Sequence, residues 1–474
     1  MQFLKNSNTA KLWYTIALVI VLIPTYFIHT QKYPDWGDDF AQYVYQAQQI
    51  HTSSKVYKEV LNVEEYSSSK RSLFFSMVLS VIKPTNTIQE YVNVISVLYI
   101  VAAIVCFFFF SYHFSLLMSF ITTLCVFYNF LFLRLKSEVV PEFLFISLFL
   151  MILHLVNQTK NWVKYFIPIL IALLISIRFV GLSLFLGYIL HLFLNKTFSL
   201  KDKLKEVLVC FCIIGAIIFL INTFCLSSVT NREVALYGTY VSKHISISSI
   251  VDNVMLYSKY ITLFFEQEIP FWTNNVIKFI VSLLFIIGFV YSVLKKRTVI
   301  EWTFIFYFLF LFIYPYNGDT IKYLIPIFPL FIYYVVFALG LLLTQFLFQW
   351  RSQLVLSGLA IILLSNSKTI WLSINRVEEN IGPYESSVLN DFEMIKKIVP
   401  DSKTIAFGKP FIVSLLMDRH SYFLSQTNYC DILNKADYAL ISKPNINELY
   451  PKTIGVKIAK GDTTELTNFY LVKL

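Results

Sequence analysis

The sequence predicts a polytopic α-helical membrane protein with a small α/β domain at its C-terminal end. Of its 474 residues, 57% are hydrophobic and only 14% are charged, whereas a soluble domain has about 25% charged residues. Long apolar runs recur up to Trp371, and the composition then becomes that of a soluble domain. The chain therefore divides into a multi-span domain, residues 1–372, and a C-terminal domain, residues 373–474.

Apolar runs near the length that crosses a bilayer, about 20 residues, recur through the multi-span domain. The first run is longer than the apolar core of a signal peptide and lacks small residues at a cleavage site, so we interpret it as an uncleaved helix. About eleven spans are predicted, within a range of ten to twelve: 12–29, 90–112, 114–133, 140–156, 163–177, 179–194, 206–226, 276–294, 300–315, 322–344 and 353–371.

Lysine and arginine predict the orientation, because they accumulate in cytoplasmic loops. With the N-terminus in the cytoplasm, the basic segments around Lys160, Lys201 and Lys295 all fall on the cytoplasmic side. This distribution accounts for most of the net charge of +10, and attraction to an anionic lipid or phosphate is the alternative explanation. No nucleic-acid partner is predicted. The outer side receives the first loop, 30–89, the loop 227–275 and the C-terminal domain. We therefore expect a multi-pass protein of the plasma membrane, the inner membrane in bacteria.

Three segments outside the spans have recognisable patterns. Residues 71–83 are apolar but too short to span, which favours a helix lying at the interface or re-entering the membrane. Residues 385–399 are amphipathic and predict a helix, and residues 410–417 predict a short one. Strands are predicted for 403–408, 436–442 and 469–474. A domain of this size can bury a modest core.

Charged residues gather at the predicted outer ends of the helices. Asp35, Asp38 and Asp39 follow the first span directly, and ionisable residues held at a membrane are costly enough to indicate function. On the same side lie Arg134, Lys136, Glu138, Glu142, Arg178, Asp319 and Lys322. A carboxylate base beside cations suits glycosyl transfer from a phosphate-linked donor, because the base deprotonates an acceptor hydroxyl while the cations hold the leaving phosphate.

The first loop resembles that of the GT-C glycosyltransferases. Within them, it is most similar to the bacterial branch related to protein O-mannosyltransferases and lipid A aminoarabinose transferases. The resemblance lies in residues 37–39, Gly-Asp-Asp, followed by Tyr43 and an alanine at helical spacing. Ser137-Glu138, Arg178 and residues 323–329 also resemble parts of that family, in the same order and on the same side of the membrane. The resemblance covers residues 10–345, roughly.

The resemblance implies an inverting transferase that moves a sugar from a polyprenyl-phosphate donor to a hydroxyl group of a lipid, glycan or protein acceptor on the outer face. Asp39 is the predicted base and Asp38 the alternative, because a register shift of one residue exchanges them. Arg178 and Lys322 are predicted to bind the donor phosphate. Further candidates are Arg134 and Lys136 for the phosphate, and Glu138, Glu142, Tyr43 and Asp319 for the substrates.

Other interpretations stay open. A transporter or flippase of lipid-linked saccharides typically has internal repeats and charges near the midplane, and a polymerase or ligase has its working loop late in the chain. Asp35 is also suited to cap a helix, and Arg178 to anchor at the interface. The cysteines and histidines lack metal-ligand spacing, so no metal site is predicted. The resemblance itself leaves a divalent ion open, since some relatives use one and others do not.

Overall fold

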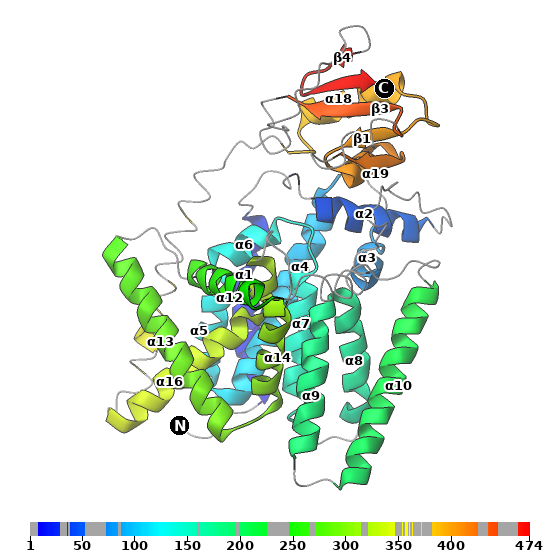
Figure 1. Cartoon of the computed structure of the whole chain (residues 1–474). Coiled ribbons are helices and arrows are strands. Elements are labelled where there is room, and N and C mark those ends of the chain that lie inside the picture. Colours follow the sequence, from blue (N-terminus) through cyan, green and yellow to red (C-terminus); the bar gives the residue numbers. More distant parts are fainter. Residues whose placement is uncertain are drawn as a thin grey trace.

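The structure is a computed structural model that describes residues 8–28, 36, 38–52, 73–83, 87–158, 162–195, 199–224, 246–264, 271–313, 321–346, 382–424, 435–443 and 463–474, with isolated positions between 353 and 371. A helical bundle forms most of the molecule, and a small sheet lies beyond one end of it (Figure 1). The first described helix begins at the opposite end of the bundle. Asp35 and Asp319 lie outside the described residues.

The bundle contains α1 (Asn8–Phe27), α2 (Asp38–His51), α3 (Leu73–Leu79), α4 (Gln89–His113), α5 (Leu116–Phe127), α6 (Phe130–Lys136), α7 (Glu142–Leu155), α8 (Val163–Ile177), η1 (Phe179–Gly181), α9 (Leu182–Leu194), α10 (Leu200–Phe224), α12 (Ile247–Leu263), α13 (Phe271–Lys295), α14 (Val299–Ile313), α15 (Ile321–Leu324), η2 (Ile325–Ile327) and α16 (Phe328–Phe346). Each predicted span from 12–29 to 322–344 overlaps one of these helices. The segment 353–371 falls almost wholly outside the described residues.

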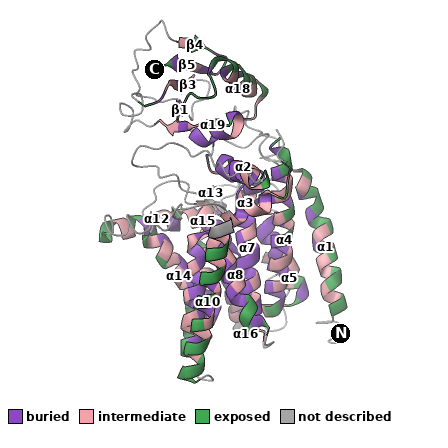
Figure 2. Cartoon of the chain, turned by 90° about the vertical axis from the view of Figure 1, so that its right-hand side faces the viewer, coloured by how far each residue is buried: buried purple, intermediate pink, exposed green. Residues whose placement is uncertain are grey.

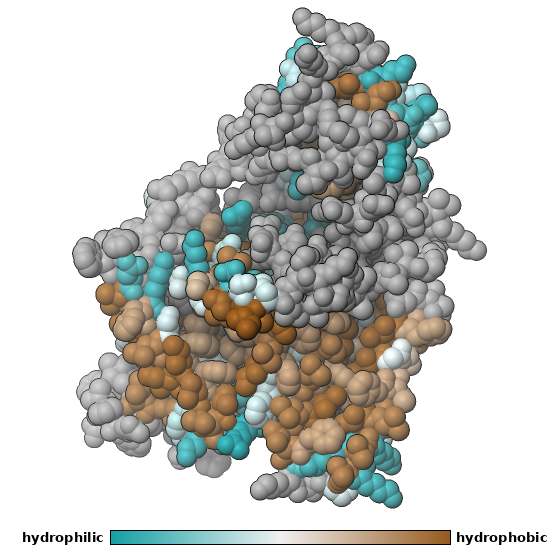
Figure 3. All heavy atoms as spheres, in the orientation of Figure 1, coloured by the Kyte–Doolittle hydropathy of each residue, from teal (hydrophilic) through white to brown (hydrophobic). Residues whose placement is uncertain are grey.

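Five of the described helical segments are long and apolar enough to cross a membrane: Asn8–Phe27, Gln89–His113, Leu200–Ile221, Asn275–Lys295 and Ile321–Leu342. A sixth is added if α5 and α6, which meet at an angle of 63°, count as one broken span. Apolar side chains cover much of the bundle surface in Figure 3, with hydrophilic residues at its lower end. The chain is a multi-pass membrane protein, and the number of about eleven spans stays a prediction.

The interior of the bundle is centred on α4 and α7, whose residues are largely buried, whereas α1 and α10 expose much of their surface (Figure 2). Two glycines allow close helix contacts. A Cβ atom at Gly187 of α9 would overlap the backbone of Thr303 on α14, and one at Gly288 of α13 would overlap the carbonyl of Tyr334 on α16. Small residues commonly let backbones approach in this way between membrane helices.

The C-terminal part is a five-stranded sheet in the order β2-β1-β3-β5-β4. Its strands are β1 (Ile405–Phe407), β2 (Ser421–Phe423), β3 (Tyr438–Ser442), β4 (Thr463–Glu465) and β5 (Phe469–Lys473), and its helices are α18 (Ser386–Ile398) and α19 (Pro410–Met417). β1 is parallel to β2 and β3, while β5 is antiparallel to β3 and β4. The predicted helices and strands occur here, and β2 and β4 are additional. The boundary at residues 372–373 stays a prediction.

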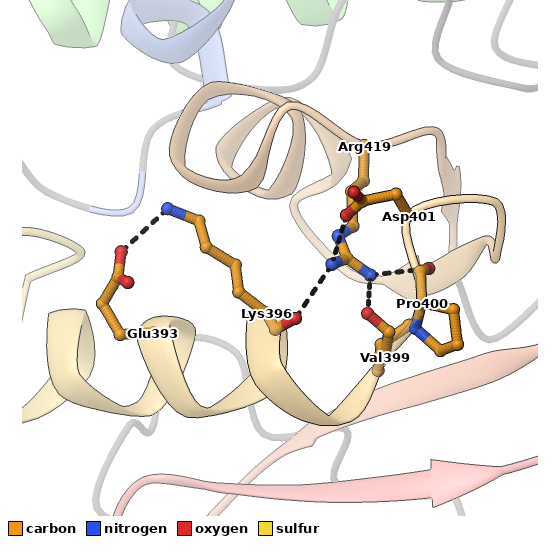
Figure 4. Close-up of polar contacts among 6 residues, drawn as sticks. All are labelled: Glu393, Lys396, Val399, Pro400, Asp401 and Arg419. Carbon is orange, nitrogen blue, oxygen red and sulfur yellow. Dashed lines mark hydrogen bonds and ion pairs between the residues drawn. The ribbon is translucent and has the colours of Figure 1, made fainter.

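Arg419 caps the C-terminal end of α18 (Figure 4). Its guanidinium group is buried and donates to the carbonyl oxygens of Lys396 at 3.1 Å, Pro400 at 2.8 Å, and Val399. It also forms an ion pair with Asp401, with 2.9 Å between nitrogen and oxygen. The last carbonyls of a helix have no partner within the helix, and a cation at that end is favoured by the helix dipole. Arg419 therefore fastens α18 to the segment that follows α19.

Candidate functional site

A buried ion pair joins the start of α7 to the end of α8. Glu142 is the first residue of α7 and is fully buried, and Arg178 follows the last residue of α8 and is 5% exposed. The guanidinium Nη2 of Arg178 donates to Oε1 of Glu142. Helix dipoles favour an anion at a helix start and a cation at a helix end. Each charge therefore occupies the end of its helix that stabilises it.

A second ion pair lies beside the first. Lys322, on α15, approaches Glu138 between α6 and α7, with 3.3 Å between Nζ and Oε2. The next residue, Tyr323, lies under the guanidinium of Arg178, with 4.9 Å from Cζ to the ring centroid. The two pairs are thus linked through adjacent residues of α15. We call Glu138, Glu142, Arg178 and Lys322 the charged cluster.

Two buried tyrosines adjoin the charged cluster. The hydroxyl of Tyr307, on α14, donates to the carbonyl oxygen of Tyr323 at 2.6 Å. Tyr257 lies on α12, which packs on both α14 and α15, and its side chain is 1% exposed. The sequence did not indicate either residue. Tyr307 is inside a uniformly apolar run, and Tyr257 falls in a segment for which no helix is predicted.

Side chains of neighbouring helices hold three helix ends. Because the last carbonyls of a helix lack partners within it, each such contact fixes where that helix stops. The contacts are Lys136 Nζ to the carbonyl of Ile28 just after α1 at 2.9 Å, Asn129 Nδ2 to that of Phe264 just after α12 at 2.8 Å, and Asn253 Nδ2 to that of Phe312 on α14 at 2.9 Å. Lys136, a predicted phosphate ligand, is fully buried in this role, whereas Arg134 is exposed on the same helix.

The predicted base lies at the start of α2. Asp38 and Asp39 form the first turn of this helix, where the dipole and the free N–H groups stabilise negative charge. Asp39 is half-buried. The side chain of Asp38 lies outside the described atoms.

The rest of α2 is anchored to α3. Tyr43 is 3% exposed, and its ring meets that of Phe75 edge-on, with 4.9 Å between centroids. Below it, Ser76 donates to the amide oxygen of Gln46 at 2.9 Å. Tyr43 is a predicted substrate residue, and the structure buries its ring in the contact between the two helices.

Six of the predicted charged residues therefore fall into two groups. One is the charged cluster, and the other is the acidic start of α2. Figure 2 places α2, α3 and α15 at the end of the bundle that faces the sheet, so both groups belong to that end. Among the described residues, no group of three or more histidine, cysteine or acidic side chains is arranged to hold a metal ion.

No protein-family model and no curated protein sequence matches this sequence. Solved structures do match its fold, and two of them align with most of this chain. The oligosaccharyltransferase of Archaeoglobus fulgidus, crystallised with a tethered acceptor peptide containing the NVT sequon, aligns with a TM-score of 0.59 and 10% identity, over 91% of this chain and 69% of its own. ArnT from Cupriavidus metallidurans in the apo state aligns with a TM-score of 0.54 and 12% identity, over 98% of both chains.

Both neighbours are GT-C glycosyltransferases. At these identities the likeness concerns the fold, which includes the bundle and, for ArnT, nearly the whole length of both chains. The predicted family resemblance is thereby confirmed for the fold, while the first-loop motif stays a prediction. The chain therefore shares the fold of ArnT and of the oligosaccharyltransferase over most of its length.

Proposed function

We propose that this protein transfers a sugar from a polyprenyl-phosphate-linked donor to a hydroxyl acceptor on the extracytoplasmic face of the membrane. The observation that carries the proposal is a GT-C fold in which an acidic helix start and paired cations belong to the same end of the bundle. The two structural neighbours support glycosyl transfer as the type of reaction. The carboxylates and cations of this chain support the roles of base and phosphate ligand.

A carboxylate of the first turn of α2 is the proposed base. Asp39, or Asp38 if the register is shifted, accepts the proton of the acceptor hydroxyl. The oxygen then attacks the anomeric carbon, a new carbon–oxygen bond forms, and the bond to the donor phosphate breaks with inversion. The electron pair of that bond leaves with the polyprenyl phosphate, so negative charge on the phosphate oxygens increases. Cations close to those oxygens stabilise the transition state.

Arg178 and Lys322 are the proposed phosphate ligands. Each is held at a helix end by a carboxylate, which offsets the cost of keeping a cation away from water. A phosphate would therefore bind by sharing or replacing those carboxylates. The Lys322 side chain is 18% exposed and that of Arg178 is 6% exposed, so we expect the phosphate to meet Lys322 first. Lys322→Gln should weaken donor binding more than Arg178→Gln.

The test is the release of polyprenyl phosphate by the purified protein from a panel of polyprenyl-phosphate sugars. Asp39→Asn keeps the size of the side chain and removes the proton-accepting charge, so transfer should fall about 10²-fold or more. Asp35→Asn is the matched control and should do far less. Loss in Asp38→Asn with full activity in Asp39→Asn would move the base by one residue. Full activity in both would contradict the proposal.

A further inference from the structure

A tryptophan two residues before the acidic turn of α2 packs into the core of the C-terminal sheet. Trp36 is 3% exposed, and its ring lies 6.3 Å from that of Phe407 on β1 and 6.2 Å from that of Phe469 on β5, measured between centroids. Both contacts are edge-to-face, with interplanar angles of 77° and 83°, and the two phenylalanine rings contact each other at 5.8 Å. Such aromatic contacts add about 0.5–1.5 kcal/mol each to the burial of the rings.

Two further contacts tie α2 to the C-terminal part. The ring of Phe40, immediately after the acidic pair, lies 6.2 Å from that of Tyr384. The hydroxyl of Tyr45 donates to Oδ1 of Asp418 at 3.2 Å. Asp418 ends α19 in the left-handed conformation, with φ of 52°, which Asp tolerates better than most residues. The helix α19 also packs against α2. We call Trp36, Phe40 and Tyr45, with their partners, the aromatic clamp.

The opposite side of α2 rests on the bundle through Tyr43 and Gln46, as described above. The helix is therefore a layer between the C-terminal sheet and the membrane helices (Figure 1). Buried apolar side chains of the bundle, of α2 and of the sheet belong to one continuous core. The C-terminal part is thus not attached by its linker alone.

We propose that the C-terminal sheet is a positioning element for the carboxylates at the start of α2, and that the aromatic clamp transmits that role. This inference rests on the proposed function. Trp36 and Phe40 flank Asp38 and Asp39 on both sides in the sequence, so the clamp fixes the direction in which the acidic turn points. A misplacement of about 1 Å at a reacting group can cost about 10² in rate. The clamp residues are positioning residues, and the carboxylate remains the base.

Steady-state kinetics of the full-length protein test the clamp. Trp36→Ala should lower kcat by about 10- to 100-fold and change the KM for the lipid donor by less than about threefold, because the donor phosphate is held by the charged cluster. Trp36→Phe retains an aromatic ring and should recover most of kcat. Tyr45→Phe removes only the hydrogen bond to Asp418 and should lower kcat a few-fold. Trp162→Ala, at an exposed tryptophan before α8, is the matched control and should change neither constant.

Hydrogen–deuterium exchange over residues 38–51 gives a readout that does not need activity. Trp36→Ala should speed exchange in α2 and leave α7 and α8 as they are. An increase in donor KM with unchanged kcat, unchanged kcat in both Trp36→Ala and Tyr45→Phe, or unchanged exchange in α2 would each overturn the inference. If the wild-type protein transfers no sugar, the proposed function fails, and exchange alone decides whether the sheet holds α2. If Trp36→Ala does not fold, Tyr45→Phe decides the kinetic test.

Discussion

The ion pair between Glu142 and Arg178 can be tested by a double-mutant cycle. Both side chains are almost completely buried, so removing one leaves the other as a buried charge without its counter-ion. That situation typically costs about 3–5 kcal/mol. Glu142→Gln should therefore lower the free energy of unfolding by about 3 kcal/mol. Arg178→Gln should cost about 1 kcal/mol more, because it also removes the contact between the guanidinium and the ring of Tyr323.

The double variant removes both charges, and we expect it to be destabilised by less than the sum of the two single variants. The coupling energy should be about 2 kcal/mol, within the range for residues in direct contact. The assay is unfolding of the purified protein in mixed micelles by a denaturing detergent, followed by the circular dichroism of the helices. The control is Glu138→Gln with Lys322→Gln, a pair nearer to solvent, whose coupling should be about 1 kcal/mol or less. Additive losses in the Glu142 and Arg178 cycle would refute the reasoning.

Three further predictions concern a close contact between two helices, the cap of α18 and the membrane topology. Gly288→Ala should lower stability by about 1–3 kcal/mol through overpacking, whereas Gly215→Ala, whose Cβ would meet nothing within 4 Å, should be neutral or stabilising in the same detergent unfolding assay. Arg419→Ala should cost about 1–3 kcal/mol, because it leaves the buried carbonyl of Val399 and the partly buried carbonyls of Lys396 and Pro400 without this donor, and limited proteolysis should then cut the C-terminal part faster. A reporter fused after Arg297 should be cytoplasmic and one after Leu474 extracytoplasmic, and a cytoplasmic signal at Leu474 would contradict the proposed function.

Most helices of the bundle could be predicted from the sequence because an apolar run of sufficient length has few alternatives in a membrane. The helix α12 was missed, since residues 247–263 mix polar and apolar side chains in a long loop. Its start does carry a local signal, because Ser246 and Ser249 exchange hydrogen bonds as a capping box. The short strands β2 and β4 were missed for a different reason: three residues are too few to show an alternating pattern.

The charged residues of the candidate site could be predicted, but their partners could not. Arg178 and Glu142 are recognisable in the sequence because each interrupts or borders an apolar run. Their pairing depends on how α7 and α8 pack, which is a non-local property of the fold. The same holds for Trp36. In the sequence it resembles an ordinary interfacial tryptophan, and only the folded structure shows that it packs against the C-terminal sheet. Its contacts with Phe407 and Phe469 join segments that are far apart in the chain.

Both groups of site residues include charges that lie at the end of a helix. Glu142 and the acidic pair of α2 begin helices, and Arg178 ends one, so each charge lies where the helix dipole favours its sign. The helix dipoles therefore stabilise charged groups beside an apolar interior, where hydration contributes little. A helix end is also fixed in direction, because its position depends on the packing of the whole helix. If the direction of the acidic turn matters for the proposed reaction, α2 needs support on both sides, because it does not span the membrane. It packs against α19 on one side, where Trp36 contacts the sheet, and against α3 on the other. Without the sheet above and α3 below, the carboxylates would be at the tip of a short helix in a loop, where orientation is easily lost.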